Sequence, residues 1–170
     1  SGVDGGALFV GADGSAALTD SSLIRARASS SVVDVRGVLV MSGGALRDSS
    51  GVPTGLTIQP GGSDASLHGV TISRLQGCTF PVAMFGGRLV IDQGSAIIEC
   101  DSITKGGIEA MSGSVLIMRD VVISGLRSQG GIGNSAAIGL GAGSTASIHR
   151  LNASGCVCSF GSGPCDAHAI

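Results

Sequence analysis

The sequence predicts an all-β protein in which short strands coil into a solenoid of about six stacked rungs. Three observations lead to this prediction: a six-residue template that recurs along the chain, a Gly/Ser turn before each copy, and the lack of a 3.6-residue apolar period. Short strands separated by glycine corners are typical of β-structure. A single rung cannot bury its own apolar side, so neighbouring rungs are expected to stack about 4.8 Å apart.

The template has apolar residues at its first and sixth positions. Its copies begin at residues 18, 46, 67, 98, 118 and 148, so successive spacings are 28, 21, 31, 20 and 30 residues, and long and short units are predicted to alternate. The first positions are expected to form one internal column: Leu18, Leu46, Leu67, Ile98, Met118 and Ile148. The sixth positions are expected to form a second column: Leu23, Ile72, Ile103 and Ile123.

Each copy follows the same lead-in, which is an apolar strand and then a Gly/Ser turn. Glycine provides the positive φ angle of a tight corner without a Cβ clash. The predicted strands are 8–10, 38–40, 56–58, 89–91, 108–111 and 138–140. The corners are 14–15, 43–44, 62–63, 94–95, 113–114 and 143–144.

Several segments of this repeat carry a family resemblance. Gly5-Gly6-Ala7-Leu8 and Gly43-Gly44-Ala45-Leu46 are similar to the GGA-aliphatic motifs of β-helical adhesins and polymorphic outer-membrane proteins. The strand-and-corner segments 67–77 and 118–126 resemble the right-handed parallel β-helix repeat of the pectate-lyase-like architecture. The resemblance covers about residues 5–155 and implies a right-handed parallel β-helix. Such motifs indicate a fold much more than a function.

The repeat divides the chain into a solenoid over residues 1–155 and a C-terminal cap or tail over residues 156–170. Three of the five cysteines, Cys156, Cys158 and Cys165, lie in the second part. Closing Cys165 onto Cys156 or Cys158 would fold the tail over the last rung, and such a link predicts an oxidising, extracytoplasmic compartment. The alternative is a reduced tail with free thiols.

The longer units place additional residues after the first, third and fifth templates. These stretches, 25–36, 77–85 and 126–134, are expected to leave one edge of the solenoid as loops, where solenoids often bind partners. The most apolar of them contains the candidate partner contacts Cys78, Phe80, Pro81 and Phe85. The alternative is that all three are simply tolerated surface loops.

Composition excludes several classes of function. Ten basic residues against twelve acidic ones give a net charge of −2, which provides no electrostatic basis for binding nucleic acid. No apolar run approaches the ~18–20 residues of a membrane-spanning helix, so the chain is not expected to cross a membrane. No initiator methionine or signal peptide is visible, which is compatible with a processed form or with a segment of a longer protein.

Catalytic chemistry has little support in the sequence. Asp20, Asp48 and Asp120 share the third template position, but other residue types interrupt this acidic column, and a role as turn residues is favoured. The second template position is predicted to face outward: Thr19, Arg47, His68, Glu99, Arg119 and His149. His68 and His149 would lie about three rungs apart, too far to share a metal. No Ser-His-Asp set, cofactor motif or metal site is identified, and no cofactor is expected.

We therefore expect a non-catalytic structural or interaction module, acting as an accessory subunit or docking scaffold for other protein chains of a larger assembly. The alternatives are a carbohydrate-active β-helix protein, such as a polysaccharide lyase or hydrolase, and a fragment of a surface adhesin. The absence of Trp and Tyr disfavours a sugar-binding groove. Asn152-Ala-Ser154 matches a glycosylation sequon, which matters only in a secreted protein.

Overall fold

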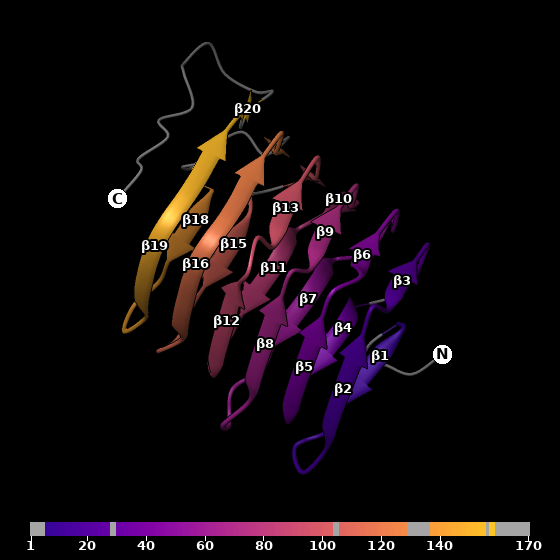
Figure 1. Cartoon of the computed structure of the whole chain (residues 1–170), viewed down its shortest axis with the longest axis vertical. Coiled ribbons are helices and arrows are strands. Elements are labelled where there is room, and N and C mark those ends of the chain that lie inside the picture. The colour runs from indigo at the N-terminus through magenta and orange to yellow at the C-terminus, as the bar shows by residue number, and fades with distance from the viewer. Residues whose placement is uncertain (1–5, 28–29, 104–105, 129–136, 156, 159–170) are drawn as a thin grey trace.

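The structure, a computed structural model, describes residues 6–27, 30–103, 106–128, 137–155 and 157–158. All regular elements within these ranges are β-strands, and the strands pair in parallel into three sheets. The first sheet has six strands, so the chain makes about five turns from its first strand to its last. The all-β class and the parallel solenoid are thereby confirmed. Figure 1 shows the strands stacked side by side, with the first and last strands at opposite ends of the stack.

Each turn contributes one strand to the first sheet. In order, these strands are β1 (Leu8–Val10), β4 (Ser31–Val35), β7 (Thr54–Ile58), β11 (Phe80–Met84), β15 (Ile108–Ala110) and β18 (Ile138–Leu140). In Figure 1 this sheet lies behind the second one.

The second sheet is the largest, and each turn crosses it in two halves joined by a corner. The first halves are β2 (Ser15–Thr19), β5 (Val38–Ser42), β8 (Asp64–His68) and β12 (Arg88–Asp92). The second halves are β3 (Ser22–Ile24), β6 (Ala45–Arg47), β9 (Thr71–Ser73) and β13 (Ala96–Ile98). In the last two turns both halves form one continuous strand, β16 (Val115–Ser124) and β19 (Thr145–Ser154).

The third sheet is short and follows the second halves after another corner. Its strands are β10 (Gln76–Cys78), β14 (Asp101–Ser102), β17 (Arg127–Ser128) and β20 (Val157–Cys158). The sequence analysis did not predict this sheet. Since β20 pairs with β17, the third sheet reaches two residues into the segment 156–170 that was assigned to a cap. The rest of that segment lies outside the described residues.

The core consists of apolar columns in which register partners stack from turn to turn. One column contains Leu18, Met41, Leu67, Ile91, Met118 and Ile148. The other contains Leu23, Leu46, Ile72, Ile97, Ile123 and Ala153. Their middle members are almost fully buried, and each buried Leu or Ile contributes about 1.5–3 kcal/mol to folding.

The register corrects the sequence analysis in two turns. Leu46 belongs to the second column, because the template of its turn is Met41-Ser-Gly-Gly-Ala-Leu46. In the fourth turn the partners are Ile91 and Ile97, separated by one additional residue in the corner, and the template was therefore placed wrongly at Ile98. Ile98 is only half-buried and Ile103 is 46% exposed, so neither belongs to the core columns.

The alternation of long and short units was a consequence of that misplacement. Column positions 18, 41, 67, 91, 118 and 148 are separated by 23, 26, 24, 27 and 30 residues. The stretches predicted as loops also contain strands of the regular coil. β4 lies within 25–36, β11 and all but the first residue of β10 lie within 77–85, and β17 lies within 126–134.

Candidate functional site

The corner between the second and third sheets places one residue per turn in the left-handed backbone region. We call this column the corner ladder, and its φ angles range from 50° to 62°. Its members, from the first turn to the last, are Arg25, Asp48, Arg74, Glu99, Gly125 and Gly155. The left-handed region favours glycine, whereas here four charged residues adopt it.

Backbone hydrogen bonds fix each ladder residue to the following turn. Asp48 N donates to Ser73 O at 3.2 Å, and Glu99 N donates to Ser124 O at 3.0 Å. The same bond is formed by Arg25, Arg74 and Gly125, with N···O distances of 3.2, 3.3 and 3.1 Å. The charged side chains therefore leave equivalent points of the coil, and their signs alternate from Arg25 to Glu99.

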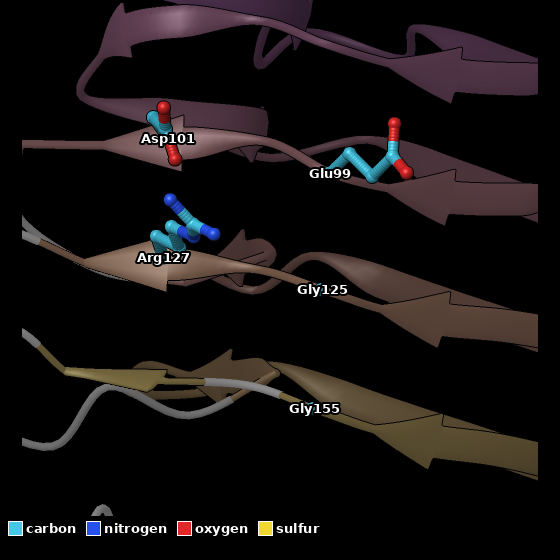
Figure 2. A pocket seen from close by; sticks show the side chains of 5 residues that line it. All are labelled: Glu99, Asp101, Gly125, Arg127 and Gly155. Carbon is cyan, nitrogen blue, oxygen red and sulfur yellow. The ribbon is translucent and has the colours of Figure 1, made fainter.

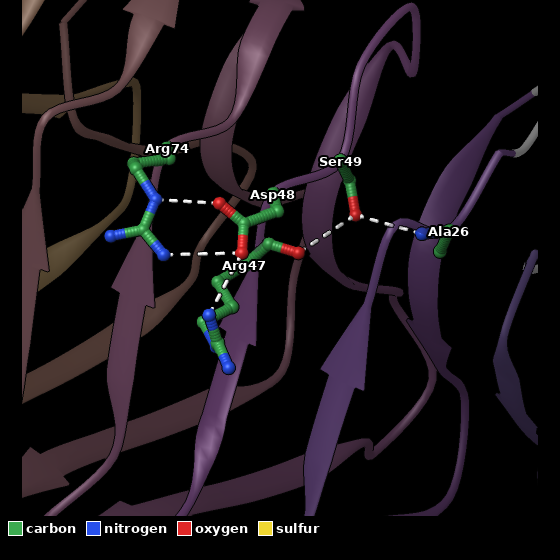
Figure 3. Close-up of polar contacts among 5 residues, drawn as sticks. All are labelled: Ala26, Arg47, Asp48, Ser49 and Arg74. Carbon is green, nitrogen blue, oxygen red and sulfur yellow. Dashed lines mark hydrogen bonds and ion pairs between the residues drawn. The ribbon is translucent and has the colours of Figure 1, made fainter.

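Asp48 is the centre of the ion pairs in this ladder (Figure 3). Arg74 Nε donates to Asp48 Oδ1 at 2.5 Å and Arg74 Nη2 to Asp48 Oδ2 at 3.1 Å, while Arg47 Nη1 donates to Oδ2 at 2.9 Å. The hydrogen bond from Arg74 is the main cause that lowers the pKa of Asp48 below its usual value, and Arg47 contributes in the same direction. Beside the ladder, Ala26 N donates to Ser49 Oγ at 3.1 Å, which joins the first two turns (Figure 3).

The ladder ends in an open hollow of about 430 Å³ where glycine replaces its charged residues. The hollow is lined by Glu99, Asp101, Arg127 and the two glycines, Gly125 and Gly155. Figure 2 shows Asp101 and Arg127 on adjacent strands, with Glu99, Gly125 and Gly155 in line on successive turns. Asp101 and Arg127 are register partners of β14 and β17.

The lining side chains are accessible to a ligand. Glu99 and Arg127 are exposed and Asp101 is half-buried, while the floor beside them is bare backbone. A Cβ built on Gly125 would approach Glu99 N at 3.5 Å and Glu99 Cγ at 3.6 Å, which is ordinary van der Waals contact. The hollow can therefore accept atoms of another molecule against its floor, with two carboxylates and one guanidinium to orient them.

The sequence analysis did not find this site because it assigned the wrong register to two turns. The segments Thr71-Ile72-Ser73-Arg74, Ala96-Ile97-Ile98-Glu99 and Val122-Ile123-Ser124-Gly125 are equivalent in the structure. Aligning them on their buried isoleucines would have displayed the change from Arg and Glu to Gly. Arg47 and Glu99 were instead predicted to share a row with His68. That row contains Ser42 and Asp92 in their places, since Ser42, His68 and Asp92 are consecutive register partners.

The sequence analysis also missed this set of a serine, a histidine and an aspartate on the outer face of the second sheet. His68 Nδ1 lies 2.5 Å from Asp92 Oδ1, and both side chains are partly buried. Hydrolysis by such a set also needs donors for an oxyanion. Of the backbone N–H groups in the corner that follows, Gly43 N donates to His68 O and Gly69 N donates to Asp92 O, both within the coil. The arrangement therefore orients an imidazole but provides neither of these donors to a substrate.

The three aspartates of the predicted acidic column do not share one column. Asp20 lies in the corner between β2 and β3 and Asp120 lies at the equivalent point within the continuous strand β16, whereas Asp48 lies in the corner ladder. All three have positive φ angles, which agrees with a role in turns. Asp120 pairs with Arg150 of the following turn, and this hydrogen bond lowers the pKa of Asp120.

The predicted partner contacts differ in accessibility. The side chains of Cys78 and Pro81 are buried, Phe80 is half-buried and Phe85 is 41% exposed. Phe80 and Phe85 are therefore the two that a partner could reach without rearrangement of the coil. Their role in binding stays a prediction.

The described part of the chain contains two free cysteines and no disulfide. Burial raises the pKa of the Cys78 thiol to about 12 and that of the Cys100 thiol to about 11. Cys156 and Cys165 lie outside the described residues, and only the backbone of Cys158 is described, so the predicted link among them stays a prediction. Asn152 is exposed on β19.

The described ranges contain no group of three or more His, Cys, Asp or Glu side chains arranged to hold a metal ion. They also contain no helix long and apolar enough to span a bilayer.

Comparisons with protein-family models, with curated proteins and with solved structures gave no match. The fold is accordingly established by the structure, and the function must be inferred from the geometry of the coil and its hollow.

Proposed function

We propose that the chain is a non-catalytic β-solenoid scaffold that docks another protein chain at the hollow beside the corner ladder. The observation that carries the proposal is the change within one column of equivalent positions. Asp48 and Arg74 pair with each other inside the chain, whereas beyond Glu99 two glycines leave the next positions bare. A partner with side chains at these positions would continue the column of paired charges that the corner ladder forms.

The coil is suited to such a role because its backbone is fixed. Each ladder residue from Arg25 to Gly125 donates a hydrogen bond to the following turn, so Glu99, Asp101 and Arg127 start from fixed points. Binding to a fixed surface loses little conformational entropy. Phe85, exposed directly after β11 in the same turn as Glu99, is a second point that the partner could cover.

Affinity capture with matched variants tests the proposal. The bait is the full chain, exposed to an extract of the cells that produce it, and the test variant is Glu99→Lys with Asp101→Lys. The control is Arg119→Glu, which changes an exposed charge on the outer face of the second sheet. We expect the wild type and the control to retain the same protein in a fixed ratio and the double variant to lose it, with unchanged melting temperatures. Equal capture by all three would contradict docking at the hollow.

The second candidate is a carbohydrate-active protein, which is favoured by the two carboxylates that line one hollow. Glycoside cleavage uses a pair of carboxyl groups as acid and as base or nucleophile. Release of new sugar ends from a polysaccharide, abolished by Glu99→Gln, would support this candidate over the scaffold.

The same proposal includes three features expected from the sequence: the handedness of the coil, its family relationship and its location. A right-handed coil is favoured, because crossover connections between parallel strands of one sheet are right-handed in nearly all cases. The GGA-aliphatic segments favour a relationship to β-helical surface proteins, and the C-terminal cysteines favour an extracytoplasmic location. Mass spectrometry of the unreduced protein tests the last point, since a fully free Cys165 would remove its basis.

A further inference from the structure

We infer that the hollow binds an arginine side chain of the docked partner, which rests on the docking function proposed above. The chain itself contains an equivalent contact between an arginine and a carboxylate. Arg74 occupies the ladder position between Asp48 and Glu99, binds the Asp48 carboxylate through two nitrogens, and interacts electrostatically with Glu99. Each carboxylate of the ladder thus has an arginine in the neighbouring turn on at least one side.

Glu99 has such a neighbour on one side only. On its other side the equivalent position is Gly125, followed by Gly155, so the ladder offers a carboxylate and two bare positions. At about 4.8 Å per turn, the first bare position lies as far from Glu99 as Arg74 does on the opposite side. A guanidinium placed there would repeat the contact that Arg74 makes with Asp48.

Charge and geometry favour arginine over other occupants. The lining contains two carboxylates and one guanidinium, so one further positive charge neutralises it. A guanidinium binds a carboxylate through two parallel N–H donors, whereas an ammonium group binds as a point charge. Arg127 lies at the side of the hollow and needs a hydrogen-bond acceptor from the partner. It is therefore suited to bind a main-chain carbonyl of the same partner segment.

The backbone at Gly125 also permits a direct test inside the chain. Asp48, Arg74 and Glu99 adopt φ angles of 58°, 50° and 53° at the same place in their turns, so a side chain is compatible with this corner. A Cβ at Gly125 meets its nearest atom at 3.5 Å. Gly125→Arg should therefore fold and extend the ladder with the chain's own arginine.

The experiment titrates the full chain with a blocked pentapeptide, acetyl-Gly-Ser-Arg-Ser-Gly-amide, and follows the backbone amides by NMR. The citrulline peptide has the same shape without the charge, and a neutral monosaccharide tests the carbohydrate alternative. We expect the arginine peptide to shift the amides of Gly125 and Gly155, with at least about tenfold weaker binding for citrulline and for Glu99→Gln. Gly125→Arg should abolish binding. The control Gly113→Arg, at a left-handed glycine in the corner between β15 and β16 whose Cβ would meet only Gly143 O at 3.9 Å, should retain it.

Each outcome decides the inference. No shift at the hollow up to about 10 mM arginine peptide, or equal shifts with citrulline, overturns it. Shifts produced by the sugar and not by the peptide overturn it in favour of the carbohydrate candidate. If partner capture still depends on Glu99 and Asp101 while the peptides do not bind, the arginine is wrong and the docking function stands. If the peptide binds but capture is the same for all baits, the docking function is wrong instead.

Discussion

His68 Nδ1 lies 2.5 Å from Asp92 Oδ1, and the two residues are register partners in adjacent turns of the second sheet. The contact joins β8 to β12 on the outer face of the coil, where both side chains are partly buried. A partly buried pair of this kind is expected to contribute more than an exposed one.

A double-mutant cycle measures this contribution. We expect His68→Ala and Asp92→Ala each to lower the free energy of unfolding by about 1 kcal/mol. Their coupling energy should be about 0.5–1.5 kcal/mol, because either change alone removes the same contact. Chemical denaturation of the four proteins near neutral pH provides the values. A coupling energy near zero would show that the pair contributes nothing to the stability of the coil.

Adjacent isoleucines on β13 test the corrected register. Ile97 is 1% exposed in the second core column, whereas Ile98 faces outward and is half-buried. We expect Ile97→Asp to destabilise the protein by at least about 3 kcal/mol, because it buries an unpaired carboxylate. Ile98→Asp should cost about 1 kcal/mol or less. Thermal melting distinguishes the two, and equal losses would contradict the assignment of the two faces.

The ion pairs of the corner ladder predict a specific response to acid. Because Arg74 lowers the pKa of Asp48, this carboxylate adds stability that is fully present above the unfolded-state pKa of about 3.9 and is lost as the pH falls through the lower folded-state pKa. In Arg74→Gln, carboxyl ¹³C NMR should show the pKa of Asp48 moving up toward its ordinary value. Asp120, whose pKa is lowered by Arg150, provides the control and should titrate as before. Arg47 remains in this variant, so part of the lowering should persist, but an Asp48 pKa that does not move at all in Arg74→Gln would assign the effect to another group.

Substitutions at two glycines with positive φ angles distinguish the cost of backbone strain from the cost of a steric clash. Gly44 has a φ of 83°, and a Cβ there would lie 1.9 Å from Ser21 O of the preceding turn. Gly51 has a φ of 65°, with no atom within 4 Å of such a Cβ. We expect Gly51→Ala to cost about 1 kcal/mol and Gly44→Ala at least about 3 kcal/mol. Similar losses in urea denaturation would mean that the turns are not packed as closely as the structure requires.

The buried thiols are predicted to resist alkylation. Since burial raises the pKa of Cys78 to about 12 and that of Cys100 to about 11, very little thiolate is present at pH 8. Iodoacetamide should leave both unmodified in the folded protein and modify both in denaturant, as measured by mass spectrometry of the peptides. Rapid labelling of Cys78 in the folded chain would indicate that the core opens at the third sheet.

The sequence was sufficient to predict the fold class, because Gly/Ser corners and short apolar strands recur at every turn. It was not sufficient for the register. Each turn has two inward residues about five positions apart, such as Leu67 and Ile72, so a template with apolar ends can align with either column. The additional residue between Ile91 and Ile97 then moved the fourth copy to Ile98.

The candidate site could not be predicted for the same reason. Glu99 and Arg47 were placed in the outward row of the second sheet, and Arg74 and Gly125 were assigned no role. The alternation of charge from Arg25 to Glu99 exists only along the coil axis, between residues 23 to 26 positions apart. A repeat with the correct mean spacing is enough to recognise a solenoid. Template positions that are wrong by five residues in one turn and by seven in another cannot align one column of corner residues.

Within the described residues, every strand pair joins residues that are 23 to 30 positions apart, and none closes over a longer segment. The described part of the coil therefore requires no single late step in which distant segments must meet. Any two neighbouring turns can act as a nucleus, and growth can proceed from them toward both ends. Damage to one turn should halt this growth locally and leave the turns on the other side able to form. A chain cut within one exposed corner should accordingly reassemble from its two pieces.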